Sequence, residues 1–224
     1  MKKILSAILA LCMVMSLSVQ LASATEKRTL PSDEVIQKTA ATFPDAANNW
    51  ALKYISYCTE NGIFNGTSAN TFNPNGNVTR AQFVVILARL YGAGKYDVKE
   101  NIYKFSDVMG DEWFVNPLDW FTNFYDFSKE GDGQFHATQI ITRGEVANAL
   151  YNYAYAQNNH SAPTITKHTD YADKNSMSDF MIKVADYLAE QGIMAGGSDN
   201  KFNPNGSLTR AQMAAILFRM PIYG

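Results

Sequence analysis

The chain has 224 residues, 46% of them hydrophobic, and a formal net charge of −2. A nearly balanced charge argues against nucleic acid as a partner, because neutralising phosphates requires clustered lysines and arginines. A chain of this length can bury a sizeable core in one or two domains.

Residues 1–24 have the layout of a secretory signal peptide. A cationic start, Lys2-Lys3, precedes an apolar run that closes with Ala22-Ser23-Ala24, which puts small residues at the −3 and −1 positions of a cleavage site. The run is short for a transmembrane anchor, the alternative interpretation. Removing 24 of the 224 residues leaves 200, with 17 basic and 21 acidic residues. We therefore expect a secreted mature chain without a membrane span.

Residues 25–42 form a short N-terminal segment, in which the sequence favours a helix from Ser32 to about Ala41. Further along, Cys58 is the only cysteine left after signal cleavage, so it cannot form an internal disulfide. Its place in a helical apolar pattern predicts a small core residue.

One stretch of eleven residues occurs twice, at residues 72–82 and 202–212, with nine identical positions, and a weaker copy lies at residues 135–145. The distance from the first aromatic to the arginine is eight residues in all three. Each copy opens with an aromatic-X-Asp motif, whose aromatic residue precedes the arginine of the same copy by 37 to 39 residues. The three motifs are Phe43-Pro44-Asp45, Phe105-Ser106-Asp107 and Tyr171-Ala172-Asp173. This spacing predicts three copies of one unit.

Each unit is predicted to contain two helices joined by a loop. The first helix carries an apolar residue every four positions and ends at a left-handed glycine, Gly62 in the first unit and Gly192 in the third. In the second unit we expect this helix to begin with Asn116 as its cap and Pro117 at the first position. Capping boxes open the second helices: Thr79 with Gln82, Thr142 with Glu145, and Thr209 with Gln212. The chain is thus predicted to be all-α, with three units sharing one core.

The unit resembles the S-layer homology module, which has an aromatic-x-Asp opening, Trp-Ala, Gly-Ile, Phe-x-Pro and Thr-Arg-Ala-Glu. Here the last motif reads Thr79-Arg80-Ala81-Gln82, Thr142-Arg143-Gly144-Glu145 and Thr209-Arg210-Ala211-Gln212. The resemblance predicts three tandem modules at residues 43–92, 105–155 and 170–221, forming a compact pseudo-threefold helical bundle. It also implies non-covalent anchoring to acidic, often pyruvylated, secondary cell-wall polysaccharide. In the family, the sugar lies in grooves between neighbouring modules, and the motif arginine meets its acidic group.

The motif also suggests an anion site on chemical grounds. A helix N-terminus has unpaired N–H groups and a partial positive charge, and an arginine at the first position adds a fork that suits carboxylate. The alternative is that each motif arginine pairs with an opening aspartate, Asp45, Asp107 or Asp173, and holds the modules together. The predicted ligand-binding residues are Arg80, Arg143, Arg210, Thr79, Thr209, Gln82, Gln212, Glu145, Trp50, Asn65, Gly66 and Gly196.

The second unit departs most from the pattern. Tyr125 replaces the glycine, and His136-Ala137 replaces the Asn-Pro of the turn. We expect this unit to keep its fold but to have an altered ligand loop. In the third unit, Ser178-Asp179 is expected at the position that Trp50 and Trp113 occupy in the other two.

Other candidate sites carry less weight. The helical spacing of Trp50, Trp113 and Trp120 favours core positions over stacking on sugars. Glu130 and Asp132 favour a turn over a calcium loop or a glycosidase pair. The three histidines lack metal-ligand spacing. We therefore expect a wall-anchored binding protein without cofactor, metal or enzymatic activity. The alternative is a structural surface-layer protein that self-associates or binds another surface protein.

Overall fold

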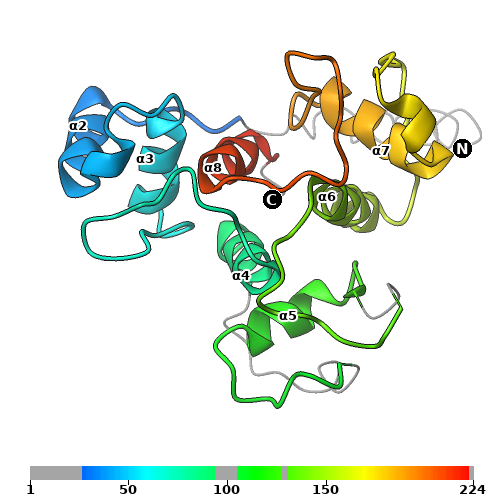
Figure 1. The fold of residues 1–224 in the computed structure, drawn as a ribbon, viewed down its shortest axis with the longest axis horizontal. Coiled ribbons are helices and arrows are strands. Elements are labelled where there is room, and N and C mark those ends of the chain that lie inside the picture. The colour runs from blue at the N-terminus through cyan, green and yellow to red at the C-terminus, as the bar shows by residue number, and fades with distance from the viewer. Residues whose placement is uncertain (1–26, 94–104, 128–130, 222–224) are drawn as a thin grey trace, which may run out of the picture.

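The computed structural model describes residues 27–93, 105–127 and 131–221, so the predicted signal peptide lies outside the described residues. These residues form seven α-helices and isolated β-bridges, which confirms the all-α class (Figure 1). No helix in the described part of the chain is long and apolar enough to cross a membrane. The unit boundaries and the pseudo-threefold symmetry stay predictions.

The predicted helix of the N-terminal segment is present as α2 (Asp33–Thr42), shifted by one residue at each end, and the Ser32 side chain caps it. This helix packs against α3 (Leu52–Glu60). The first unit therefore carries one helix before its opening motif.

The first helices of the three units are α3, α5 (Val115–Phe121) and α7 (Asp179–Glu190). The predicted left-handed glycines are confirmed, with φ of +64° at Gly62 and +70° at Gly192. The predicted start of α5 at Pro117 is wrong, because the helix begins two residues earlier. A proline is tolerated there since the N–H groups of a first turn have no partner within the helix.

The second helices are α4 (Arg80–Leu90), α6 (Arg143–Gln157) and α8 (Arg210–Arg219). All three predicted capping boxes are present: each threonine oxygen accepts from the N–H three residues later, and the Gln or Glu side chain there accepts from the threonine N–H. These reciprocal bonds fix where each helix begins.

The helices pair between units rather than within them. Helix α5 packs on α4, α7 packs on α6, and α3 packs on α8. Each pair thus combines the first helix of one unit with the second helix of the preceding unit, and the last pair joins the first unit to the third. In Figure 1, α4, α6 and α8 lie near the centre and α3, α5 and α7 lie outside them.

The opening aspartates hold the turn in front of each second helix. Asp45 accepts the N–H groups of Phe72 at 3.0 Å and Asn73 at 2.7 Å. Asp107 and Asp173 make the same two bonds in their own units, at 2.8 to 2.9 Å. The second donor is left-handed in every unit, with φ of 59°, 53° and 55° at Asn73, His136 and Asn203. Asparagine and histidine are among the non-glycine residues that adopt this conformation most readily, so His136 preserves the turn.

The core is built from the residues that the repeat shares. The loop aromatics Phe72, Phe135 and Phe202 are fully buried. Cys58 is also fully buried, as predicted, and its thiol lies 3.7 Å from the Ala214 carbonyl of α8. Burial raises the pKa of this thiol to about 12, against the opposing effect of the Arg28 charge. The thiol is therefore neutral and sits at the contact between the first and third units.

Candidate functional site

Two motif arginines reach into the loop of a neighbouring unit. The Nε of Arg210 donates to the Phe72 carbonyl and its Nη2 donates to the Asn65 carbonyl, both at 2.7 Å. Arg143 makes the equivalent bonds to Phe202 at 2.9 Å and Ala195 at 3.0 Å. Arg210 is only 3% exposed, so its guanidinium serves the contact between units. Burial lowers the pKa of Arg210 to about 10, against the nearby charge of Asp45, and the side chain stays charged at neutral pH.

Arg80 has a different partner. Its guanidinium forms an ion pair with Glu145 of the second unit, with Nε 2.7 Å from the carboxylate, and also donates to the Phe135 carbonyl at 3.2 Å. Only 5% of the Arg80 side chain and 11% of the Glu145 side chain are exposed. The same Glu145 carboxylate accepts the Thr142 N–H of its own capping box at 2.6 Å. One carboxylate thus caps α6 and binds the first unit.

The first N–H groups of the second helices already have acceptors. The N–H of Arg80 donates to the Gln139 carbonyl at 2.9 Å, and that of Ala81 donates to Ala137 at 3.0 Å. The first two N–H groups of α6 and α8 make equivalent bonds. Those of α6 donate to carbonyls of the third unit, and those of α8 donate to carbonyls of the first unit. The expectation that these groups are unpaired is therefore wrong. Carbonyls of the neighbouring turn fill the positions that an anion would need.

The structure separates the predicted ligand residues into several places. Trp50, Arg143 and Gln212 come together around a small hollow of about 80 Å³. Asn65 and Gly66 line a different cavity, of about 550 Å³, between α2 and the end of α3. The side chains of Thr79, Gln82, Thr209 and Glu145 take part in the caps.

Gly66 and Gly196 have packing reasons to be glycine. A Cβ on Gly66 would lie 2.5 Å from the Phe43 ring, and one on Gly196 would lie 3.3 Å from the Tyr171 ring. Each glycine therefore lets the opening aromatic of its unit lie against the loop backbone.

Two tryptophans lie on the surface. Trp50 is 60% exposed and Trp113 is 63% exposed, so the preference for core positions is wrong for both, whereas Trp120 is half-buried and packs on Phe124. In the third unit the equivalent residue is Phe180, which is 48% exposed and precedes Gly192 by the same twelve residues that separate Trp50 from Gly62. The expectation that Ser178-Asp179 takes this place is corrected, because α7 begins earlier relative to its glycine than α3 does.

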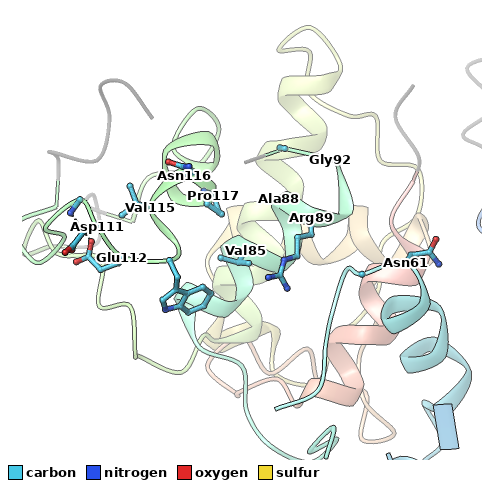
Figure 2. Close-up of a pocket in the computed structure, with 14 residues that line it drawn as sticks. Asn61, Val85, Ala88, Arg89, Gly92, Asp111, Glu112, Val115, Asn116 and Pro117 are labelled. Carbon is cyan, nitrogen blue, oxygen red and sulfur yellow. Dashed lines mark hydrogen bonds between the residues drawn. The ribbon is translucent and has the colours of Figure 1, made fainter. Parts of the chain in front are cut away.

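The larger of the two grooves beside these tryptophans, the α4–α5 groove, has a volume of about 680 Å³. It is lined by α4, the residues just after α3 and the segment leading into α5 (Figure 2). Trp113 belongs to that segment and also lines the groove. Arg89 points into it from α4, and Asp111 and Glu112 lie across from it. The Glu112 carboxylate accepts the N–H groups of Met109 and Gly110, both at 2.9 Å. The Met109 bond is the main cause of the lowered pKa of Glu112, which is ionised at neutral pH.

The second groove, the α8–α3 groove, joins the third unit to the first. It comprises the hollow beside Trp50 and a further hollow of about 440 Å³, which share Ile193 and Arg219. The guanidinium of Arg219 lies 5.6 Å from the centre of the Tyr54 ring of α3. The larger hollow is also lined by Lys27, Arg28 and Glu190.

The sequence prediction missed Arg89 and Arg219. Each follows the motif arginine of its unit by nine residues, and Asn152 holds that position in the second unit. The available signal was an arginine at the same position of two helices that are otherwise apolar after their Thr-Arg-Ala-Gln motif.

Comparison with known proteins assigns the chain to a family. Residues 42–84 and 170–214 match the S-layer homology domain, and the second unit lies outside both matches. The chain belongs to the S-layer homology domain family. Domains of this family attach proteins to the cell surface.

Three relatives illustrate the range of proteins that carry this region. The chain is 32% identical over 79% of its length to an amylopullulanase of Thermoanaerobacterium thermosulfurigenes. It is 28% identical over 69% of its length to a cellulosome-anchoring protein of Acetivibrio thermocellus, and 30% identical over 61% to an S-layer protein of Bacillus licheniformis. It spans only 9%, 34% and 15% of these proteins. The similarity therefore concerns one region of larger proteins.

Proposed function

We propose that this protein is a secreted, non-catalytic anchor that binds acidic, pyruvylated secondary cell-wall polysaccharide. The observation that carries the proposal is the pairing of an exposed tryptophan with an arginine in both grooves: Trp113 with Arg89, and Trp50 with Arg219. Each pair draws its two residues from different units, so a sugar bound there would touch both.

The chemistry of these pairs suits an acidic sugar. An indole ring offers a flat apolar surface to the C–H face of a pyranose, and a guanidinium offers two parallel donors to a carboxylate. Both tryptophans lie two residues before the start of a first helix, and their rings are exposed there.

The motif residues have a supporting role in this proposal. Arg80 and Arg210 hold the units together, and the glycines Gly66 and Gly196 hold the loops against the opening aromatics. Arg143 is the motif arginine that we propose contacts the ligand, because it is less buried and lines the same hollow as Trp50.

The test is retention of the mature protein by purified cell-wall sacculi. We expect Trp50→Ala combined with Trp113→Ala to lower retention at least tenfold while the urea midpoint stays unchanged, because both rings are exposed. Met109→Ala is the matched control, since Met109 is 84% exposed and lines neither groove. Full retention of the folded double variant would overturn the proposal. Concentration-dependent assembly without wall polymer, seen by analytical ultracentrifugation, would favour the surface-layer alternative.

A further inference from the structure

A pocket outside the two grooves lies between helix α2 and the first unit. This α2 pocket has a volume of about 550 Å³, and its lining comes from α2, the last turn of α3 and the loop that follows. Every lining residue falls within residues 35–69, a continuous part of the chain that the structure describes. Thr39 is the only buried residue of α2, so this helix lies beside α3 without filling the space between them (Figure 1).

The loop side of the α2 pocket is held in place by hydrogen bonds. The Asn65 carbonyl accepts from Arg210 of the third unit at 2.7 Å. The N–H groups of Thr67 and Ser68 both donate to the Thr71 carbonyl, at 2.8 and 3.2 Å. The wall of the pocket is therefore formed before a ligand arrives, which is the usual state of a binding site for a small molecule.

Hydrogen-bond acceptors dominate the polar lining of the α2 pocket. Thr39, Thr42 and Thr59 each donate their hydroxyl proton to a carbonyl of their own helix, at 2.9 to 3.0 Å, so their oxygens are left to accept. Lys38 and Glu60 are the charged residues of the lining, and their charges cancel. Within the described part of the chain, neither of these two side chains has a hydrogen-bond or ion-pair partner. An uncharged molecule rich in O–H donors matches this lining.

The third unit shows what a carboxylate in the place of Glu60 binds. Glu60 and Glu190 both precede the left-handed glycine of their unit by two residues. The Glu190 carboxylate accepts the backbone N–H of Thr166 at 3.0 Å and also accepts the Thr166 hydroxyl. Thr166 belongs to the segment that leads into the third unit, whereas α2 leads into the first. Glu60 therefore keeps available the two acceptor oxygens that Glu190 uses within its own chain.

We propose that the α2 pocket is a second binding site, which takes an uncharged sugar outside the two grooves. Two adjacent sugar hydroxyls donate to the Glu60 carboxylate, in the way that the N–H and hydroxyl of Thr166 donate to Glu190. The threonine oxygens accept further hydroxyls, and Val35 lies in the apolar part of the lining. This site uses no tryptophan or arginine of the grooves, so it goes beyond the proposed function and can fail separately from it.

The test titrates the isotope-labelled mature chain with uncharged sugars and follows its backbone amide signals by NMR. The probes are glucose, galactose, N-acetylglucosamine and N-acetylmannosamine. We expect at least one of them to cause saturable shifts at residues 59–60 and 65–69, with a Kd in the millimolar range. Glu60→Gln should weaken this binding by about fivefold or more, because it removes one of the two carboxylate acceptors. Glu34→Gln is the matched control and should change the Kd by less than about twofold, since Glu34 is an exposed glutamate of α2 that does not line the pocket.

Three results would overturn the site. One is the absence of shifts at the pocket amides with all four sugars, and another is an unchanged Kd in Glu60→Gln. The third is a response of these amides to an acetylated peptide with the sequence of residues 164–168 but to none of the sugars, which would make the pocket a peptide site. Shifts confined to the indole N–H signals of Trp50 and Trp113 would place the sugar in the grooves, which refutes this site and leaves the proposed function standing. Loss of retention by sacculi, in contrast, bears only on the proposed function.

Discussion

The guanidinium of Arg210 donates to the backbone carbonyl of Phe72 at 2.7 Å, across 138 residues of sequence. The N–H of Phe72 is bound at 3.0 Å by Asp45 of its own unit, so this one residue is held by its own unit and by its neighbour. The same arrangement recurs at Phe135 and Phe202. It gives a physical reason for the repeat to keep an aspartate, an aromatic and an arginine at fixed separations.

Arg210→Ala should destabilise the fold strongly. The substitution leaves the buried Phe72 carbonyl and the Asn65 carbonyl without their charged donor, so we expect a loss of about 2–4 kcal/mol in the free energy of unfolding. Urea unfolding followed by circular dichroism measures it. Arg89→Ala, an exposed arginine on α4, should change stability by less than about 0.5 kcal/mol. Equal effects of the two substitutions would contradict the structural role of Arg210.

Arg80 and Glu145 should behave as a coupled pair. Removing either partner leaves a poorly solvated charge, so each single substitution, Arg80→Met or Glu145→Gln, should cost about 3–5 kcal/mol. The double variant should be less destabilised than the sum of the two, and a double-mutant cycle in urea measures the difference. Strict additivity would show that the pair contributes nothing beyond its separate contacts. For the same reason we expect Arg80→Ala combined with Arg210→Ala to unfold the chain rather than release a folded protein from the wall.

The Cys58 thiol should not react in the folded protein. Burial raises its pKa from 9.0 to about 12, so almost no thiolate forms at pH 8 and a reagent has no access. A thiol-reactive dye should label Cys58 only after denaturant is added. Because the fold disfavours the thiolate, the protein should also lose stability as the pH rises from about 9 towards 12. Rapid labelling of the native chain at pH 8 would contradict this burial.

Asp173 should make the fold sensitive to acid. Its partial desolvation works against ionisation, but the N–H bonds from Asn203 and Phe202 outweigh that effect and hold the pKa below 3.8. A lowered pKa contributes stability above about pH 4 that is lost as the pH falls through the folded value. Asp173→Asn should therefore be less stable than the unaltered chain at pH 7.

The difference between the two chains should shrink as the pH falls below about 3.8, as measured by thermal unfolding across a pH series. Asp111→Asn is the control, because Asp111 is an exposed carboxylate away from the turn of the third unit. A stability difference for Asp173→Asn that does not depend on pH would rule out the charge as its cause.

Local features of this fold were predictable from the sequence. The capping box at Thr79, the left-handed Gly62 and the start of α2 near Ser32 each depend on residues within one or two turns. Contacts between units were not predictable in this way. The partner of Arg80 is Glu145, 65 residues away, and a periodic pattern alone does not indicate which helix packs on which.

The candidate grooves were predictable only in part. Trp50 was included among the predicted ligand residues, but its exposure depends on how α8 of another unit lies beside it. The spacing of an aromatic residue within a helix is the same whether a neighbour covers it or not. Arg89 and Arg219 can be recognised as candidate ligand contacts only from the structure, because residues of other units complete the grooves that they line.

The packing of α3 against α8 has a consequence for how such a chain changes in evolution. An open array of repeats can gain or lose one copy at an end, because each copy contacts only its neighbours in sequence. Here α3 of the first copy packs on α8 of the last copy. Deleting a copy would therefore leave one helix in each of two remaining copies without its packing partner. Adding a copy at one end would separate the first and last copies, which now contact each other. The copy number is therefore set by closure of the ring, and duplication should proceed by whole sets of three.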